Sequence, residues 1–468
     1  MASVPKQTRI QHLHLRAGFG EKASVIRADD KKSVKAVVKE LFKNSATPVP
    51  FRLVEEPAGD LRAKKEMDPL ERRMLIRGSK EQIRALNLRW LDRMAGGPDA
   101  LRQKMTLFWH GHFACKARNA YFTQQYLNTL QEHALGKFGD LLHAVSKTPA
   151  MLQFLNNQQN RKDSPNENFA REVMELFTLG RGNYAESDVK NAARAFTGWG
   201  FDAEGKYAFR PNQHDSDPKT FFGKTGSFTG EDILRMILER KETARFVSHQ
   251  LYRCFVNDRP DSARVLAMAD RFYQSDYDIR DLMEFVFTAD WFYDARNVGT
   301  HIKSPIELIV GLNRMLDIRY EDENALLFVQ KVLGQVALYP PSVAGWAGGR
   351  DWIDSSSLLF RMKLPELLFQ SAEVDTEAKD DGDVETETLG KRQGRQLRAL
   401  PHWDDYRRTF ANYPDRTLFE PLAAYLLQTP VTASQRALIE QRAAGATQAD
   451  RIQQLTLALL TLPEYQLS

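Results

Sequence analysis

The pattern Ser-Pro-x-Glu occurs twice, at residues 164–167 and 304–307, and it constrains the fold more than any other feature of the chain. The serine can cap a helix, the proline has no amide hydrogen to leave unpaired in the first turn, and the glutamate can complete a capping box. A helix is therefore expected at each copy, and Gly180 suits the left-handed end of the first one. Ser79 and Gln82 form a further capping pair that predicts the start of another helix.

Helical periodicity continues through most of the chain, and strand signals are few. The segments 207–209 and 220–222 flank a polar loop and predict a short hairpin. We therefore expect a predominantly all-α fold, a multi-helical globular array with one short β-hairpin-like insert. The first of the two glutamate-capped helices should bury Phe169, Val173 and Leu176 on its apolar stripe.

Length and local composition predict three parts. The chain has 468 residues, more than the roughly 250–300 residues that one hydrophobic core serves. Acidic residues crowd the stretch 371–400, which has few apolar residues and which we interpret as a disordered insert or linker. We expect a main helical domain over residues 1–370 and C-terminal helices over residues 401–468 that pack back on it.

Composition and missing motifs exclude several classes of protein. The formal net charge is only +4, from 65 basic and 61 acidic residues, so nucleic-acid binding is not expected. The sequence has no P-loop, dinucleotide-binding glycine pattern, His-Glu-x-x-His motif or nucleophile elbow. It shows neither a signal-peptide core at its start nor a stretch that could span a bilayer, so we expect a cytoplasmic protein without membrane insertion.

His110 and His112 are the first candidates for chemistry. On an extended backbone, two histidines at this spacing can reach one metal ion. On a helix they point about 200° apart, and only His112 then shares the apolar face with Phe108. The alternative to a metal site is a buried, hydrogen-bonded His112 and a solvated His110.

Asn168, Glu172 and Glu175 fall within about 60° of one another beside the apolar stripe of the first glutamate-capped helix. Carboxylates at the border of a buried face cost free energy unless they are paired or bind something. Metal ligation and general acid–base catalysis are the functional interpretations. The alternative is a ladder of ion pairs with Arg171, which would neutralise Glu175 but would leave Glu172 without a partner in the helix.

Two loops add weaker candidates. His214 and Asp215 lie between the strand-like segments and could contribute to a metal or acid–base site. Asn157 and Arg161 belong to an amide-rich run that could bind a sugar or a peptide, because an amide both donates and accepts hydrogen bonds. Both segments are equally typical of ordinary solvated loops.

Several stretches, in order along the chain, match a known protein family, and the most specific is Pro-Asn-Glu-Asn-Phe-Ala-Arg-Glu at residues 165–172. The others are 12–20, 107–113, 155–162, 173–180, 195–199, 214–215, 219–223, 303–307, 340–346 and 352–353. In these stretches the chain resembles the large bacterial family catalogued as domain of unknown function number 1800. The resemblance implies no settled activity, substrate or cofactor, although many similar proteins carry an export signal. It does imply that the His-x-His segment, the glutamate helix and the His-Asp loop form one polar site.

Two functions follow from these candidates. As an enzyme, the chain would hydrolyse a polar substrate between helices, with catalysis by Glu172, Glu175, His214 and Asp215. A divalent metal such as zinc, iron or manganese would be held by His110, His112, Glu172 and His214. As a non-catalytic protein, it would bind a small polar molecule, glycan or peptide through Asn157, Arg161, Asn168, Trp199 and Trp346.

Overall fold

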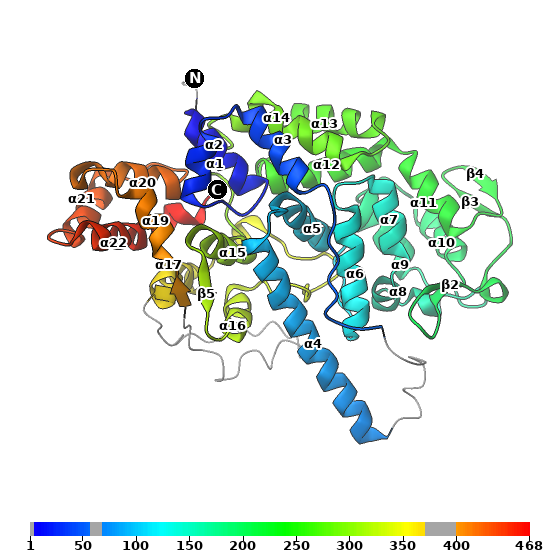
Figure 1. Ribbon diagram of the computed structural model, residues 1–468. Coiled ribbons are helices and arrows are strands. Elements are labelled where there is room, and N and C mark those ends of the chain that lie inside the picture. The colour runs from blue at the N-terminus through cyan, green and yellow to red at the C-terminus, as the bar shows by residue number, and fades with distance from the viewer. Residues whose placement is uncertain (1–3, 57–67, 370–398) are drawn as a thin grey trace.

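The computed structural model describes residues 4–56, 68–369 and 399–468, and its fold is predominantly helical, as the sequence predicts (Figure 1). The predicted acidic insert falls outside these residues except for its last two positions. The first helices are α1 (Lys6–Arg16), α2 (Ala23–Asp29), α3 (Val34–Asn44), α4 (Pro69–Gly96), α5 (Ala100–His112), α6 (Ala120–His133), α7 (Phe138–Ser146), α8 (Pro149–Phe154), α9 (Asn168–Glu172) and α10 (Glu186–Ala195). They are followed by α11 (Gly230–Leu238), α12 (Lys241–Phe255), α13 (Ser262–Gln274), α14 (Ile279–Thr288), α15 (Pro305–Leu316), α16 (Asn324–Leu333), α17 (Ser355–Phe369), α19 (Trp403–Phe410), α20 (Phe419–Leu426), α21 (Ala433–Arg442) and α22 (Gln448–Leu460).

Short strands form three antiparallel pairs among the described residues. The pairs are β1 (Trp199–Phe201) with β2 (Tyr207–Phe209), β3 (Lys219–Phe221) with β4 (Lys224–Gly226), and β5 (Ile318–Tyr320) with β6 (Ala399–Pro401). The predicted hairpin between 207–209 and 220–222 is therefore wrong in its pairing. Each segment pairs with a strand nearer in sequence, which closes a shorter loop at a lower entropic cost.

The second Ser-Pro-x-Glu copy caps its helix as predicted. Ser304 Oγ accepts a hydrogen bond from the Glu307 amide at 3.3 Å, and Glu307 Oε2 accepts one from the Ser304 amide at 2.6 Å. At the first copy the helix begins only at Asn168. There, Asn160 Oδ1 accepts a hydrogen bond from the Asn166 amide at 2.9 Å and holds the chain in a turn before the helix. A nearby amide side chain has displaced the expected cap.

The helix predicted to start at Ser79 begins earlier, at Pro69, so Ser79 lies inside α4 and does not cap it. Instead its hydroxyl donates to the Arg118 carbonyl and accepts from the Ala120 amide, each at 2.8 Å. These bonds join α4 to the start of α6. The N-terminal end of α4 projects from the body of the molecule (Figure 1), and Met74 there is 65% exposed.

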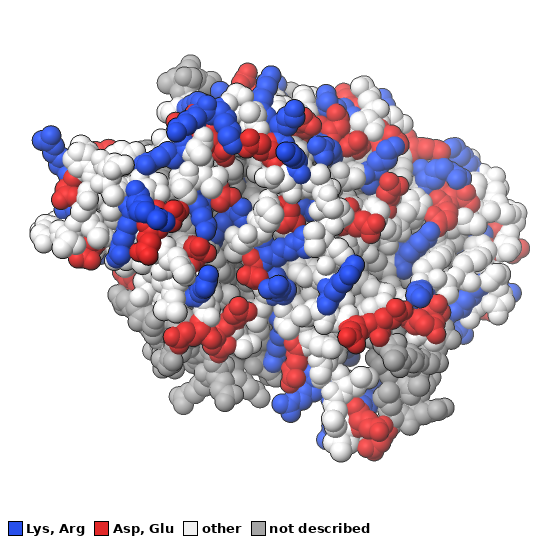
Figure 2. Space-filling view, in the orientation of Figure 1, with Lys and Arg blue, Asp and Glu red and all other residues white. Residues whose placement is uncertain are grey.

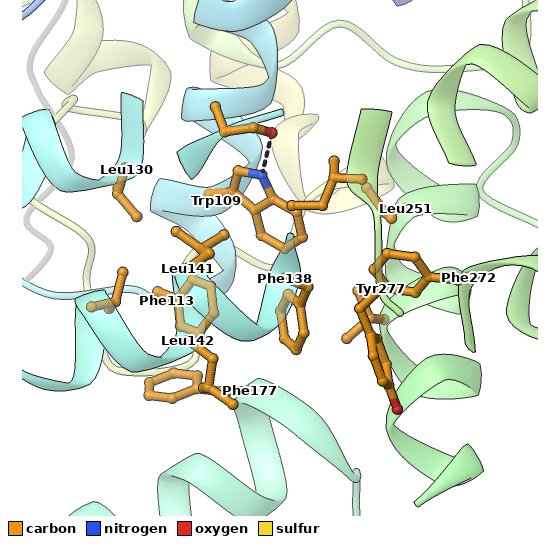
Figure 3. Close-up of a cluster of buried hydrophobic side chains, with 14 of the residues drawn as sticks. Trp109, Phe113, Leu130, Phe138, Leu141, Leu142, Phe177, Leu251, Phe272 and Tyr277 are labelled. Atoms are coloured by element: carbon orange, nitrogen blue, oxygen red, sulfur yellow. Dashed lines mark hydrogen bonds between the residues drawn. The ribbon is translucent and has the colours of Figure 1, made fainter. Parts of the chain in front are cut away.

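Two hydrophobic cores organise the chain. The first includes α5 and α12 and contains the aromatic cluster around Trp109 and Phe138 (Figure 3). The second includes α15, the C-terminal half of α4 and the C-terminal helices, and it contains Trp90 and Ile306. The domain division at residue 370 stays a prediction.

The surface carries charges of both signs. Lys and Arg side chains are intermixed with Asp and Glu side chains over the face seen in Figure 2. Among the helices of the described residues, none is long and apolar enough to cross a membrane.

Candidate functional site

A pocket of about 500 Å³ lies where segments from both cores meet, and we call it the central pocket. It is lined by one face of α5, one face of α12, the turn that follows α9, the start of α15 and the loop 343–352, with single residues from the connecting segments. Its polar lining residues are Lys104, His112, Glu175, Arg181, Gln250, Arg253, Cys254, Asp258, His301, Ser304, Glu307 and Gln335. Its aromatic lining residues are Phe108, Phe246, Trp346 and Trp352. A volume of this size suits a small organic molecule.

The loop 343–352 is fastened against α5 by a close approach of two glycines. Gly345 has φ +72°, and a Cβ atom there would lie 2.4 Å from the Gly111 carbonyl oxygen. No larger residue fits this position without moving one of the two segments. The contact holds Trp346 beside α5, with its ring 5.6 Å from the ring of His110.

A row of ionisable side chains lies along the pocket wall. Lys104 of α5 forms an ion pair with Oε1 of Glu307 in the first turn of α15. His301 lies between two carboxylates: its Nε2 is 3.5 Å from Glu307 Oε2, and its Nδ1 is 3.2 Å from Asp258 Oδ1. Arg16 is buried and is attracted by the same two carboxylates. The row therefore sets basic and imidazole groups beside carboxylates and joins four distant parts of the sequence.

The row is arranged to keep its carboxylates ionised. Burial alone raises the pKa of Glu307, but the Lys104 ammonium and the His301 imidazole bring it well below its ordinary value. The same opposition acts on Asp258, whose pKa is raised by burial and lowered overall by His301 and Arg16. Burial raises the pKa of the Cys254 thiol to about 12, so this pocket thiol is not an activated nucleophile.

His112 contributes a neutral imidazole to the pocket. Its Nε2 lies 2.8 Å from the Phe177 carbonyl oxygen, and burial lowers its pKa to about 4. Because a carbonyl can only accept, Nε2 carries the hydrogen and Nδ1 keeps a lone pair. The hydrogen bond agrees with the sequence prediction for His112, but the residue is half-buried and not buried, because it lines the pocket.

A π-helical turn positions Glu175. The α9 helix continues as η3 (Val173–Thr178), in which the Leu179 amide donates to the Met174 carbonyl at 2.9 Å, five residues back. Such turns recur at functional sites because they redirect side chains within a helix. Here Glu175 and Leu176 line the pocket, whereas Val173 is fully buried.

Glu175 does not belong to the predicted ion-pair ladder. Arg171 instead pairs with Glu167 and Glu186. Glu175 accepts hydrogen bonds from Arg181 Nε at 2.6 Å and from the Tyr184 hydroxyl at 2.8 Å, and these two partners lower its pKa.

Glu172 lies outside the lining of the central pocket. Burial and the neighbouring Glu175 raise its pKa, and it has no hydrogen bond or ion pair with any residue that the structure describes. His110 is fully buried and not solvated, so that part of the expectation is wrong. Its ring lies 5.5 Å from the ring of Trp90, because α5 is enclosed by α4 on this side.

His214 and Asp215 fasten their own loop and do not line the central pocket. His214 Nδ1 lies 2.9 Å from the Thr197 carbonyl oxygen. The Asp215 carboxylate accepts two hydrogen bonds from Arg194, at 2.7 Å and 3.2 Å. Although burial raises the pKa of Asp215, this guanidinium lowers it overall.

The predicted ligand-binding residues are dispersed. Only Trp346 lines the central pocket. Asn157 and Trp199 are buried, and Asn157 Oδ1 accepts a hydrogen bond from the side-chain amide of Asn160, three residues later, at 3.2 Å. Arg161 and Asn168 are exposed and lie away from the pocket lining.

The predicted metal ligands are not gathered. Within residues 4–56, 68–369 and 399–468, no three His, Cys, Asp or Glu side chains are arranged to hold a metal ion. The set His110, His112, Glu172 and His214 therefore does not form a ligand group. At the buried Glu307 carboxylate, the Lys104 ammonium supplies the compensating positive charge.

Sequence reasoning missed most of the pocket wall. Lys104 shares a face of α5 with Phe108 and His112 at spacings of four residues, and a lysine on an apolar stripe is a usable signal. Asp258 and His301 stand alone in the sequence and carry no such signal. Glu307 is recognisable as a capping residue, but its second carboxylate oxygen acts in the pocket.

Comparisons with known proteins give one match. The family model described as Protein of unknown function (DUF1800) matches residues 12–467, nearly the whole chain. No curated protein and no solved structure matches the chain.

Proposed function

The chain belongs to the DUF1800 family of proteins of unknown function, and we propose that it is an enzyme that hydrolyses a small polar substrate in the central pocket. The observation that carries this proposal is the convergence of acidic, basic and imidazole side chains from distant segments on one pocket of about 500 Å³. Perturbed ionisable groups in a pocket of this size are the usual mark of an active site.

His301 is the proposed general acid–base residue. The Asp258 carboxylate, 3.2 Å from Nδ1, accepts a hydrogen bond from that nitrogen and fixes the orientation of the ring. Nε2 faces Glu307 Oε2 at 3.5 Å, so in this proposal the ring turns from that carboxylate to take a proton from an attacking water. Lys104 and Arg16 supply positive charge close to this row, so the proposed reaction needs no metal ligand among the residues first predicted.

Of the four catalytic residues predicted from the sequence, Glu175 is the one that lines the pocket. It stays in the proposal as a carboxylate that can orient the substrate, because Arg181 and Tyr184 hold it in place. Glu172, His214 and Asp215 have no role in the proposed reaction.

The test is a panel of chromogenic nitrophenyl esters, anilides, glycosides and phosphates assayed with the wild-type chain, His301→Gln and Asp258→Asn. Loss of a general base should lower kcat by roughly 10²–10⁴-fold. His214→Gln is the matched control, because His214 also adjoins an aspartate but lies outside the pocket lining. Activity that survives in His301→Gln as well as in His214→Gln would contradict the assignment.

The second candidate function is non-catalytic binding of a small glycan or peptide. Trp346, Trp352, Gln250 and Gln335 line the same pocket, and aromatic faces with amides are typical of such binding. The two functions differ in the fate of the ligand. Recovery of a bound ligand unchanged after prolonged incubation would favour binding, and its conversion would favour the enzyme.

A further inference from the structure

The carboxylates of the central pocket already have partners within the chain. Glu175 is bonded to Arg181, Glu307 is paired with Lys104, and Asp258 lies against His301. The capacity of these groups to attract a cationic ligand is therefore largely used. The hydrogen-bond donors of the pocket that lack an acceptor among the described residues are then the groups available to a ligand.

Arg253 is the principal donor without a partner. It lies in the last turn of α12 and lines the pocket, one turn after Gln250 on the same face. Its guanidinium has no hydrogen bond or ion pair with any residue in the described part of the chain. It attracts Asp258 only from beyond contact distance. Arg181, the other exposed pocket arginine, is by contrast already bound to Glu175.

Gln335 adds a second donor. Its Oε1 accepts a hydrogen bond from the Ile306 amide at 3.0 Å, so its acceptor oxygen is committed to the start of α15. The side chain is 5% exposed and lines the pocket, which leaves its amide hydrogens as the polar group available there. The charged group of the pocket that is left without a partner among the described residues is thus a donor, Arg253, beside the Gln335 amide and the apolar faces of Phe108 and Trp346.

We propose that the central pocket takes an organic oxyanion, a carboxylate or a phosphate ester on a planar apolar body. The oxyanion binds the Arg253 guanidinium, whose planar fork matches two oxygens of such a group. The apolar body lies on the aromatic faces. This inference rests on the proposed function, since it names the class of substrate that the same pocket would take.

The experiment uses three fluorinated probes of nearly equal size and follows their binding to the full chain by fluorine NMR. The probes are 4-fluorobenzoate and 4-fluorophenyl phosphate, which are anions, and 4-fluorobenzamide, which is neutral. At least one anion should bind about tenfold more tightly than the amide, a ratio equivalent to about 1.4 kcal/mol. The stronger anion identifies which oxyanion the pocket prefers.

Arg253→Gln should abolish this preference while leaving the amide affinity unchanged. Arg245→Gln is the matched control, because Arg245 is an exposed arginine of the same helix that does not line the pocket. Both variants remove one positive charge, so a general electrostatic effect would alter them equally. Circular dichroism of both variants establishes that they are folded.

Equal affinities of the three probes, no binding by any of them, or equal losses in Arg253→Gln and Arg245→Gln would each overturn the oxyanion site. These outcomes are separate from a failure of the hydrolytic proposal. Turnover of neutral substrates that depends on His301, without preference for anions, would overturn the oxyanion site alone. Preference for anions without turnover of any substrate would retain the site and remove the hydrolase.

Discussion

The buried pair of Lys104 and Glu307 offers the sharpest test of the pocket electrostatics. The Lys104 side chain is 4% exposed and that of Glu307 is 10% exposed. Lys104→Met keeps much of the side-chain length but removes the charge. Removing one partner of a buried ion pair leaves an uncompensated charge, which typically costs about 3–5 kcal/mol.

The structure places the expected cost near the lower end of that range. After the substitution, Glu307 Oε2 keeps the Ser304 amide at 2.6 Å and the His301 Nε2 at 3.5 Å. These contacts offset part of the lost attraction. We expect Lys104→Met to lower the free energy of unfolding by about 3 kcal/mol at neutral pH.

The sign of the pH dependence follows from the Glu307 carboxyl. In the wild type its pKa is well below the ordinary value, so its stabilising contribution is present above about pH 4.5 and is lost as the pH falls through the lowered value. Without Lys104, burial dominates and raises this pKa. The loss of stability should therefore reach its full value at neutral pH. It should become smaller in acid, as Glu307 takes up a proton in the variant.

The assay is urea unfolding followed by far-ultraviolet circular dichroism, with hydrogen exchange of the α15 peptide as a local measure. Lys224→Met is the matched control, since Lys224 and Glu239 form an ion pair at 2.8 Å whose side chains are 60% and 51% exposed. Loss of this exposed ion pair should lower the free energy of unfolding by at most about 1 kcal/mol. The double variant Lys104→Met with Glu307→Gln should regain most of the lost stability. The reasoning is refuted if Lys104→Met is no worse than the control, or if the double variant is no better than the single one.

Three further predictions concern packing, backbone and titration. Val173→Asp should unfold the α9 region, because Val173 is fully buried and an unpaired carboxylate there costs several kcal/mol; an unchanged melting curve would contradict it. Gly345→Ala should destabilise the chain and weaken binding of 4-fluorobenzoate, because the new Cβ would lie 2.4 Å from the Gly111 oxygen. The control is Gly334→Ala, which is also at positive φ but has open space around it and should leave binding unchanged. Burial lowers the pKa of Lys303 to about 7, so the wild type should lose stability as the pH falls from about 10.5 to 7, and Lys303→Met should reduce that slope in unfolding titrations.

Of the capping signals in the sequence, the one at Ser304 was confirmed and those at Ser79 and Ser164 were wrong. The capping box at Ser304 and Glu307 needs only residues three apart, and it forms as predicted. The cap at Ser164 fails because the side chain of Asn160 competes for the backbone of Asn166. Such competition depends on a turn conformation that periodicity does not reveal.

The candidate site was predicted in part. Three of the predicted residues, His112, Glu175 and Trp346, line the central pocket, and the sequence marks each by its place at the border of an apolar face or in an unusual loop; their roles stay predictions. Lys104 and Glu307 are separated by 203 positions, and His301 and Asp258 by 43. Contacts at such separations are set by tertiary packing, so no local pattern contains them.

Glu307 links the fold to the chemistry of the pocket. One of its carboxylate oxygens caps α15, which belongs to the second core, and the other pairs with Lys104 of α5, which belongs to the first core. The adjoining His301 exchanges backbone hydrogen bonds with Ser468, which adds the C-terminal segment to the same wall. Because the pocket lies between the two cores, we expect the charge pair that joins them to influence the relative placement of His301 and Asp258, the proposed catalytic groups. Lys104→Met combined with Glu307→Gln should therefore restore stability without restoring full activity, and a double variant that is both stable and fully active would show that the pair serves the fold alone.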